Sequence, residues 1–95
     1  MTVIYHEPQS WFFLKNNIDY FIDVNCNYSA FGFSLLIQLN ETEINDYNEN
    51  GQKFLANFAN DIQYHALTKY MSRQIKGEVE KSVYDAIQLF NKNYH

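Results

Sequence analysis

The sequence predicts a small α+β domain in which an antiparallel meander of three to four strands is followed by two helices packed on one sheet face. Two observations predict this class. Apolar residues alternate with a period of two over Ile18–Cys26 and Ala30–Leu39, and the apolar spacing becomes helical after Asn40. With 95 residues, 46% of them hydrophobic and 18% aromatic, the chain can form one core. We therefore expect a single domain over residues 1–95.

The predicted strands come first. Ser10–Lys15 is a short aromatic run that ends at an Asn-Asn pair, a turn signal. Ile18–Cys26 and Ala30–Leu39 each place apolar side chains on one face and mostly polar ones on the other. A further strand at Val3–Tyr5 is only weakly signalled and would be the fourth.

Two helices are expected after the sheet. Asn40 is the predicted N-cap, and Glu43 completes a capping box. The helical spacing continues past Gly51, which we interpret as a close helix–sheet contact, with a break at this glycine as the alternative. A second apolar stripe starts at about Glu78. The segment 65–77 receives no assignment from its pattern.

The sheet face turned away from both helices would carry Asp19, Phe21 and Asp23. Two carboxylates around an exposed apolar group are typical of a protein-binding surface. The alternative is that the C-terminal helix or the 65–77 segment folds over this face. The exposed side of the first helix adds three acids to the predicted partner-binding residues: Glu43, Asp46 and Glu49.

Charge is unevenly distributed along the chain. Residues 1–52 hold seven acids and one base, whereas residues 53–95 hold four acids and six bases, for a net charge of −4. An acidic half repels phosphate backbones and attracts a basic protein, so we expect no direct nucleic-acid partner. Solubility alone would also account for such acids.

Residues that carry chemistry are few. Cys26, the only cysteine, falls on the core face of its strand, where a thiol is inert. His6 and His65 lack the spacing of metal ligands. Asp19 and Asp23 would lie ~13 Å apart along a strand, too far for a retaining glycosidase pair. We expect no catalytic residues, no metal, no cofactor and no enzymatic activity.

The location expected from the sequence is the cytoplasm. The chain holds no base before Lys15 and no long apolar stretch near its start, so no secretory signal is expected. Its apolar runs are far shorter than the ~20 residues of a membrane helix, so no membrane partner is expected. A lone cysteine is consistent with a reducing compartment.

The stretch SWFFLKNNIDYFIDVNCNYSAFGFSLLIQLNETE, residues 10–43, resembles the small bacterial immunity proteins encoded beside contact-dependent growth inhibition and related polymorphic toxins. The resemblance lies in size, acidity and α+β layout over the first two thirds of the chain, without a diagnostic motif. It implies an antitoxin-like inhibitor that binds a cognate toxin, frequently a basic nuclease. It transfers no functional residue to this chain.

Three other functions stay open at this stage. The chain could be an adaptor module of a complex unrelated to toxins, or a structural homodimer that pairs its open sheet faces. A small enzyme is the third alternative, although the sequence shows no convergent set of polar groups for one.

Overall fold

The computed structural model describes residues 1–28 and 31–94 and contains a four-stranded antiparallel sheet in the order β1-β2-β3-β4. The strands are β1 (Thr2–Glu7), β2 (Trp11–Asn16), β3 (Asp19–Tyr28) and β4 (Phe31–Gln38). The helices are α1 (Glu41–Asn50), α2 (Gln52–His65) and α3 (Glu78–Tyr94). The predicted α+β class, with a meander followed by helices, is confirmed. Ala30, the predicted first residue of the last strand, lies outside the described residues.

The weakly signalled N-terminal strand is present. It extends over Thr2–Glu7 and pairs with β2, with an irregular register between Val3 and Tyr5. The next connection, between β2 and β3, is a two-residue loop in which Asn17 has a φ of 57°, a left-handed conformation that asparagine tolerates. Ile18 belongs to this loop and is 83% exposed, so the expectation that it faces the core with the rest of β3 is wrong.

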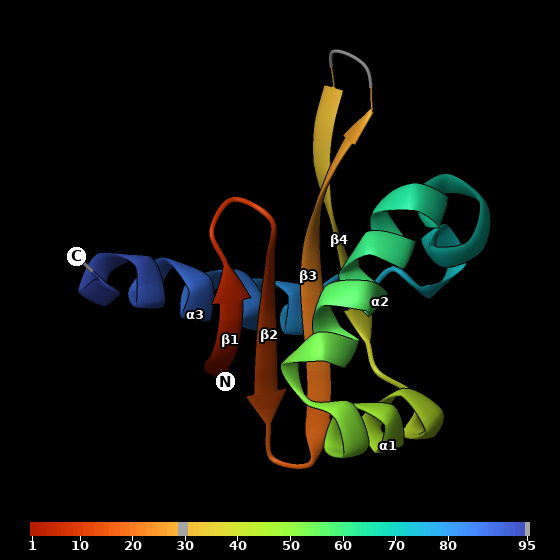
Figure 1. Ribbon diagram of the computed structural model, residues 1–95. Coiled ribbons are helices and arrows are strands. Elements are labelled where there is room, and N and C mark those ends of the chain that lie inside the picture. The colour runs from red at the N-terminus through yellow and green to blue at the C-terminus, as the bar shows by residue number, and fades with distance from the viewer. Residues whose placement is uncertain (29–30, 95) are drawn as a thin grey trace.

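The helices cover both faces of the sheet (Figure 1). On the face covered by α1 and α2, the core forms from Phe13, Ile22, Val24, Leu35 and Ile37 with Leu55, Phe58 and Ile62. On the other face, α3 places Val83 against Leu14, Phe21 and Leu36. The prediction that the helices share one face is therefore wrong for α3, and the alternative of a C-terminal helix over the second face is correct.

The second face has an apolar patch of its own, which explains why α3 lies there. Leu14 and Phe21 are register partners in β2 and β3, and Leu36 of β4 is opposite Asp23. These three apolar side chains are at most 3% exposed. Burial of apolar surface contributes about 25 cal/mol per Å², so an amphipathic helix is stabilised on this patch. The alternating pattern of β3 concealed it, because Phe21 stands there between two aspartates.

The helix expected to run through Gly51 breaks at that residue. Gly51 has φ 62° and ψ −137°, a conformation that side-chain-bearing residues rarely adopt. A Cβ atom at Gly51 would meet no atom within 4 Å, so the interpretation as a close helix–sheet contact is wrong. The predicted capping box is confirmed: the backbone N–H of Glu43 donates to Asn40 Oδ1, and that of Asn40 donates to Glu43 Oε1, both at 2.9 Å.

The segment 65–77 carries the chain from one face of the sheet to the other. It forms a π-helical turn, Ala66–Tyr70, and a 3₁₀ turn, Met71–Arg73. Gln74 then bridges to Ile37 of β4, and the backbone N–H of Ile75 donates to the carbonyl of Leu36 at 2.9 Å. Because this segment runs around the β4 edge, α3 packs on the sheet face opposite to that covered by α2.

Candidate functional site

The predicted contact residues of β3 lie in two different environments. Asp19 is exposed at the start of the strand, where its Oδ1 accepts a hydrogen bond from Gln38 Nε2 at 3.3 Å. Phe21 and Asp23 are buried beneath α3, with exposed fractions of 3% and 7%. The expected open face is therefore absent: α3 covers Phe21, and Asp23 lines a cleft between the sheet and α3.

The three predicted acids of α1 also differ from one another. Glu43 accepts two hydrogen bonds from the Arg73 guanidinium, and its side chain is only 14% exposed, so it anchors the helix. Asp46 is half-buried and Glu49 is exposed. Within the described part of the chain, neither carboxylate forms an ion pair. These two acids remain accessible to a partner.

Tyr47 lies between these two acids in the sequence of α1 and packs against aromatic rings of the sheet. The ring of Tyr47 on α1 has its centroid 4.7 Å from that of Phe13, 5.7 Å from that of Tyr20 and 6.5 Å from that of Tyr5. Burial, followed by the proximity of Tyr5 and Tyr20, raises the pKa of the Tyr47 phenol. Tyr5 on β1 is 36% exposed. We call Tyr5, Asp46, Tyr47 and Glu49 the α1 surface.

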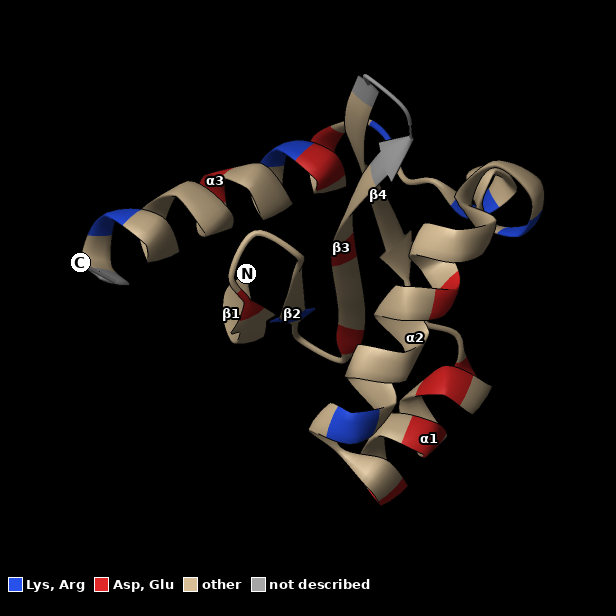
Figure 2. Cartoon of the chain, turned by 45° about the horizontal axis from the view of Figure 1, so that its top comes forward, with Lys and Arg blue, Asp and Glu red and all other residues tan. Residues whose placement is uncertain are grey.

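One acid of the α1 surface, Glu49, lies in the last turn of the helix, where negative charge is least favourable. Figure 2 shows acidic residues spaced along α1 from its first turn to its last. The C-terminal end of a helix carries partial negative charge, so Glu49 is expected to cost about 0.3–1 kcal/mol. The last turn of α1 contains no basic residue. Helix stability therefore does not explain Glu49.

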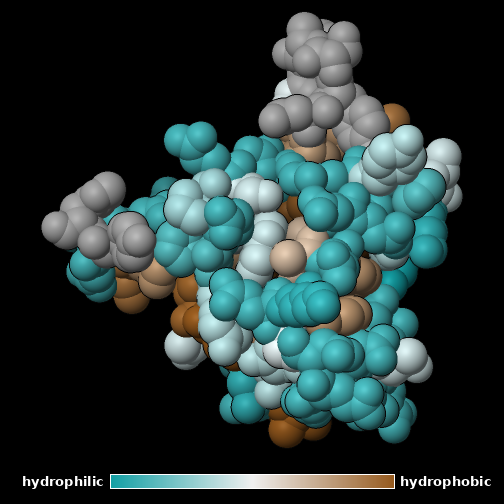
Figure 3. Space-filling model, in the orientation of Figure 1, coloured by the Kyte–Doolittle hydropathy of each residue, from teal (hydrophilic) through white to brown (hydrophobic). Residues whose placement is uncertain are grey.

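Hydrophobic side chains interrupt the hydrophilic surface at the end of the molecule where α1 lies (Figure 1 and Figure 3). Brown atoms appear at the lower tip of the view, where Figure 1 places the β2–β3 loop. This loop carries Ile18, which at 83% is the most exposed large hydrophobic side chain among the described residues. In Figure 1 this loop and α1 lie at the same end of the molecule, and exposed apolar and acidic groups together are typical of a protein-binding surface.

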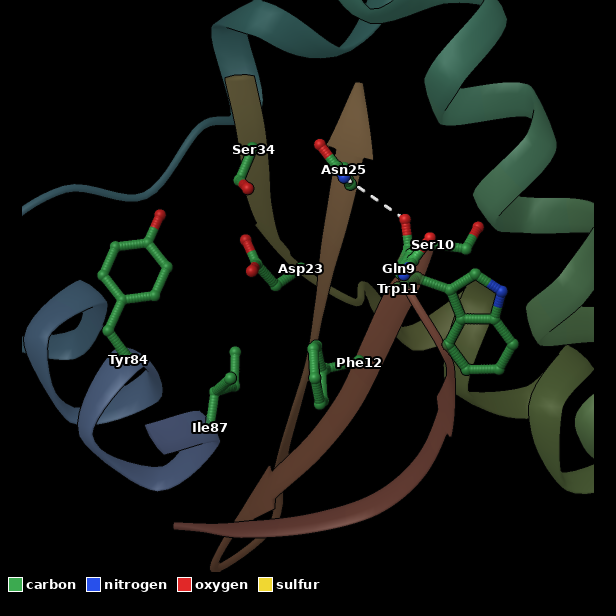
Figure 4. Close-up of a pocket in the computed structure, with 9 residues that line it drawn as sticks. All are labelled: Gln9, Ser10, Trp11, Phe12, Asp23, Asn25, Ser34, Tyr84 and Ile87. Carbon is green, nitrogen blue, oxygen red and sulfur yellow. Dashed lines mark hydrogen bonds between the residues drawn. The ribbon is translucent and has the colours of Figure 1, made fainter. Parts of the chain in front are cut away.

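A second candidate site is a cleft of about 310 Å³ between the sheet and α3. Figure 4 shows its walls, with Asp23 and Asn25 of β3 facing Tyr84 of α3, and Ser34 of β4 beside them. Asn25 Nδ2 donates to the backbone carbonyl of Gln9 in the β1–β2 turn at 3.2 Å, which closes one end. The nine lining residues include no Lys, Arg or His.

Asp23 is the electrostatic centre of this cleft. No donor among the described residues reaches its buried Oδ1. Burial, with a smaller contribution from the nearby Glu80 carboxylate, raises the pKa of Asp23 to about 6. Burial and then the charges of Asp23 and Glu80 raise the pKa of the Tyr84 phenol. Sequence reasoning missed the cleft, although the signal was present in an aspartate that shares a strand face with Phe21 and Leu36.

The single thiol lies in the core, as the sequence predicted. Cys26 is fully buried, and its Sγ donates to the carbonyl of Val24 at 3.5 Å. Burial, with a smaller contribution from Asp23, raises the pKa of this thiol to about 11. Across residues 1–28 and 31–94, no group of three or more His, Cys, Asp or Glu side chains is arranged to hold a metal ion.

No protein-family model matches this chain, and neither the curated proteins nor the solved structures contain a match. No helix in the described ranges is long and apolar enough to cross a membrane. The two candidate sites themselves are therefore the basis for assigning a function to this chain.

Proposed function

We propose that this chain is a non-catalytic immunity protein that binds and neutralises a cognate toxin in the cytoplasm through the α1 surface. The toxin would be a basic protein, such as a nuclease domain. The observation that carries this proposal is the pair Asp46 and Glu49, two carboxylates that form no ion pair among the described residues, of which Glu49 lies in the unfavourable last turn of α1. A carboxylate that destabilises its helix and has no partner within the protein is expected where the surface is selected to bind a cationic group of another molecule.

The α1 surface combines the two kinds of group that such binding requires. Carboxylates attract a cationic partner and raise the rate of association. Partly buried aromatic rings at the centre of a contact slow dissociation, and tyrosine is enriched among such residues. Tyr47 is held by its contacts with Phe13 and Tyr20, so little side-chain entropy is lost when a partner covers it.

The first experiment is capture of the tagged protein from its native organism, with the bound protein identified by mass spectrometry. We expect a basic partner in a one-to-one complex that is toxic when expressed alone and harmless when co-expressed with this chain. A partner without toxicity would indicate an adaptor instead. Recovery of the chain alone or as a homodimer would contradict the proposal.

Two charge-matched variants test the surface once the partner is known. Asp46→Lys combined with Glu49→Lys reverses the charge of the α1 surface. Glu78→Lys combined with Asp85→Lys makes the same change at exposed positions of α3, on the other face. We expect the first pair to weaken binding at least 100-fold and the second less than fivefold. Equal losses would show that overall charge, not the α1 surface, governs binding.

A further inference from the structure

The cleft between β3 and α3 has the properties of a binding site for a cation. Asp23 is only 7% exposed, and its Oδ1 has no hydrogen-bond donor among the described residues. In Figure 4 its carboxylate points away from β3, toward the space between Ser34 and Tyr84. A buried acceptor without a donor is costly, and a ligand that brings donors would remove that cost.

The charges around the cleft favour a positive ligand. Glu80 on α3 contributes to the raised pKa of Asp23, although its side chain does not line the cleft. Lys76, just before α3, has its Nζ 3.8 Å from Glu80 Oε2 and does not line the cleft. Within the cleft, the negative potential of Asp23 is thus left without a cationic partner.

The shape and the other walls indicate which cation fits. The volume of about 310 Å³ accommodates a small organic group. Phe12 and Tyr84 provide aromatic surface, on which a planar guanidinium can stack. The hydroxyl of Ser34 and the carboxylate of Asp23 provide acceptors for its fork of N–H donors.

We propose that this cleft binds a guanidinium group, with Asp23 as its counter-ion and Phe12 and Tyr84 as its walls. The group belongs either to a free small molecule or to an arginine side chain of a protein. The cleft lies beneath α3 and is separate from the α1 surface, so this proposal does not depend on the proposed immunity function.

The test is a titration of the ¹⁵N-labelled protein with methylguanidinium at pH 7.5, followed by NMR. Methylurea, which is neutral and of the same shape, is the matched ligand control. We expect shifts of the Asp23, Ser34 and Tyr84 amides with a dissociation constant on the order of 1–10 mM, and at least tenfold weaker binding of methylurea. Equal binding of the two probes, or none at these concentrations, would overturn the proposal.

Variants then locate the site and its source. Asp23→Asn should weaken methylguanidinium binding at least tenfold, whereas Glu41→Gln, a loss of the same charge at an exposed position of α1 outside the α1 surface, should leave it unchanged. Ser34→Leu fills the cleft but keeps the Asp23 carboxylate, and it should also abolish binding. This second variant tests the site even if Asp23→Asn does not fold. Tighter binding of agmatine than of N-acetylarginine amide indicates a free ligand, and the reverse order indicates a protein arginine. Binding unaffected by both cleft variants would overturn the assignment.

Discussion

Arg73 and Glu43 form a bidentate ion pair that joins the 3₁₀ turn to the first turn of α1. Nη1 of Arg73 donates to Oε2 of Glu43 at 2.8 Å, and Nη2 donates to Oε1 at 2.7 Å. Nη2 also donates to the carbonyl of Gln38 at 3.0 Å, so one guanidinium connects three segments. Since α1 contains no fully buried residue, this contact and the capping box are the main polar anchors of the helix.

We expect Arg73→Lys to lower the free energy of unfolding by about 1–2 kcal/mol, because lysine cannot form the two parallel hydrogen bonds of the guanidinium fork. Glu43→Gln should cost a similar amount. In a double-mutant cycle measured by urea denaturation, the two changes should couple by about 1 kcal/mol. If the two stability losses were strictly additive, the interaction between Arg73 and Glu43 would contribute nothing to the free energy of unfolding.

The charge distribution along α1 predicts opposite effects at its two ends. Glu49→Lys places a cation in the last turn and should raise the free energy of unfolding by about 0.5 kcal/mol. Glu41→Lys, a matched charge reversal in the first turn, should lower it by a similar amount. Thermal and urea denaturation at low salt measure both effects. Shifts of the same sign would show that total charge outweighs the helix dipole.

The strands of this fold were predictable because their signal is local. Alternation in β3 and β4 predicts which side chains enter the core under α2, and Ile22, Val24, Leu35 and Ile37 are all fully buried there. The capping box at Asn40 is equally local. The break at Gly51 was ambiguous, because its apolar neighbours keep helical spacing on both sides of it. Only the backbone conformation of the glycine decides between the alternatives.

The position of α3 could not be derived in the same way. It depends on the path of residues 66–75 around the β4 edge, which is determined by the bridge from Gln74 to Ile37 and by the Arg73 contacts. Neither has a periodic signature. The same uncertainty affected the candidate site, because the exposure of Phe21 and Asp23 depends entirely on where α3 lies. Asp46 and Glu49 were unaffected, since they face away from the core in either arrangement.

Gly51 should tolerate no side chain without a loss of stability. We expect Gly51→Ala to lower the free energy of unfolding by about 1–3 kcal/mol, because its φ of 62° with ψ of −137° is strained for alanine. The space around it is empty, so the loss would be conformational and not steric. Gln52→Ala, at the first residue of α2, is the control and should change stability by less than about 0.5 kcal/mol. Equal losses of stability for Gly51→Ala and Gln52→Ala would contradict the proposed backbone strain at residue 51.

Cys26 should be unreactive in the folded protein. Its thiol is fully enclosed, and its pKa of about 11 leaves almost no thiolate at pH 8. A disulfide reagent such as dithionitrobenzoate should therefore modify it only as fast as the protein unfolds. In 6 M guanidinium chloride the reaction should be complete within the mixing time. Rapid modification under native conditions would show that the β3–α2 interface opens without global unfolding.

Asp23 should make stability depend on pH in an identifiable window. Its native pKa of about 6 lies above the ordinary value of 3.8, so between these values the native state binds more protons than the unfolded chain. The free energy of unfolding should therefore fall as the pH rises from 4 to 6, and stay lower above pH 7. A shift of about two pKa units corresponds to roughly 3 kcal/mol.

Asp23→Asn should remove this dependence. The variant and the natural protein should have similar stability at pH 4, whereas at pH 7.5 the variant should be more stable by about 2–3 kcal/mol, because asparagine carries no charge to desolvate. Urea denaturation at both pH values gives the difference directly, since all other titrating groups are common to the two proteins. Asp19→Asn, at an exposed position of the same strand face, is the matched control and should leave the profile unchanged. Parallel profiles for Asp23→Asn and the natural protein would show that the Asp23 carboxylate ionises in the cleft without penalty.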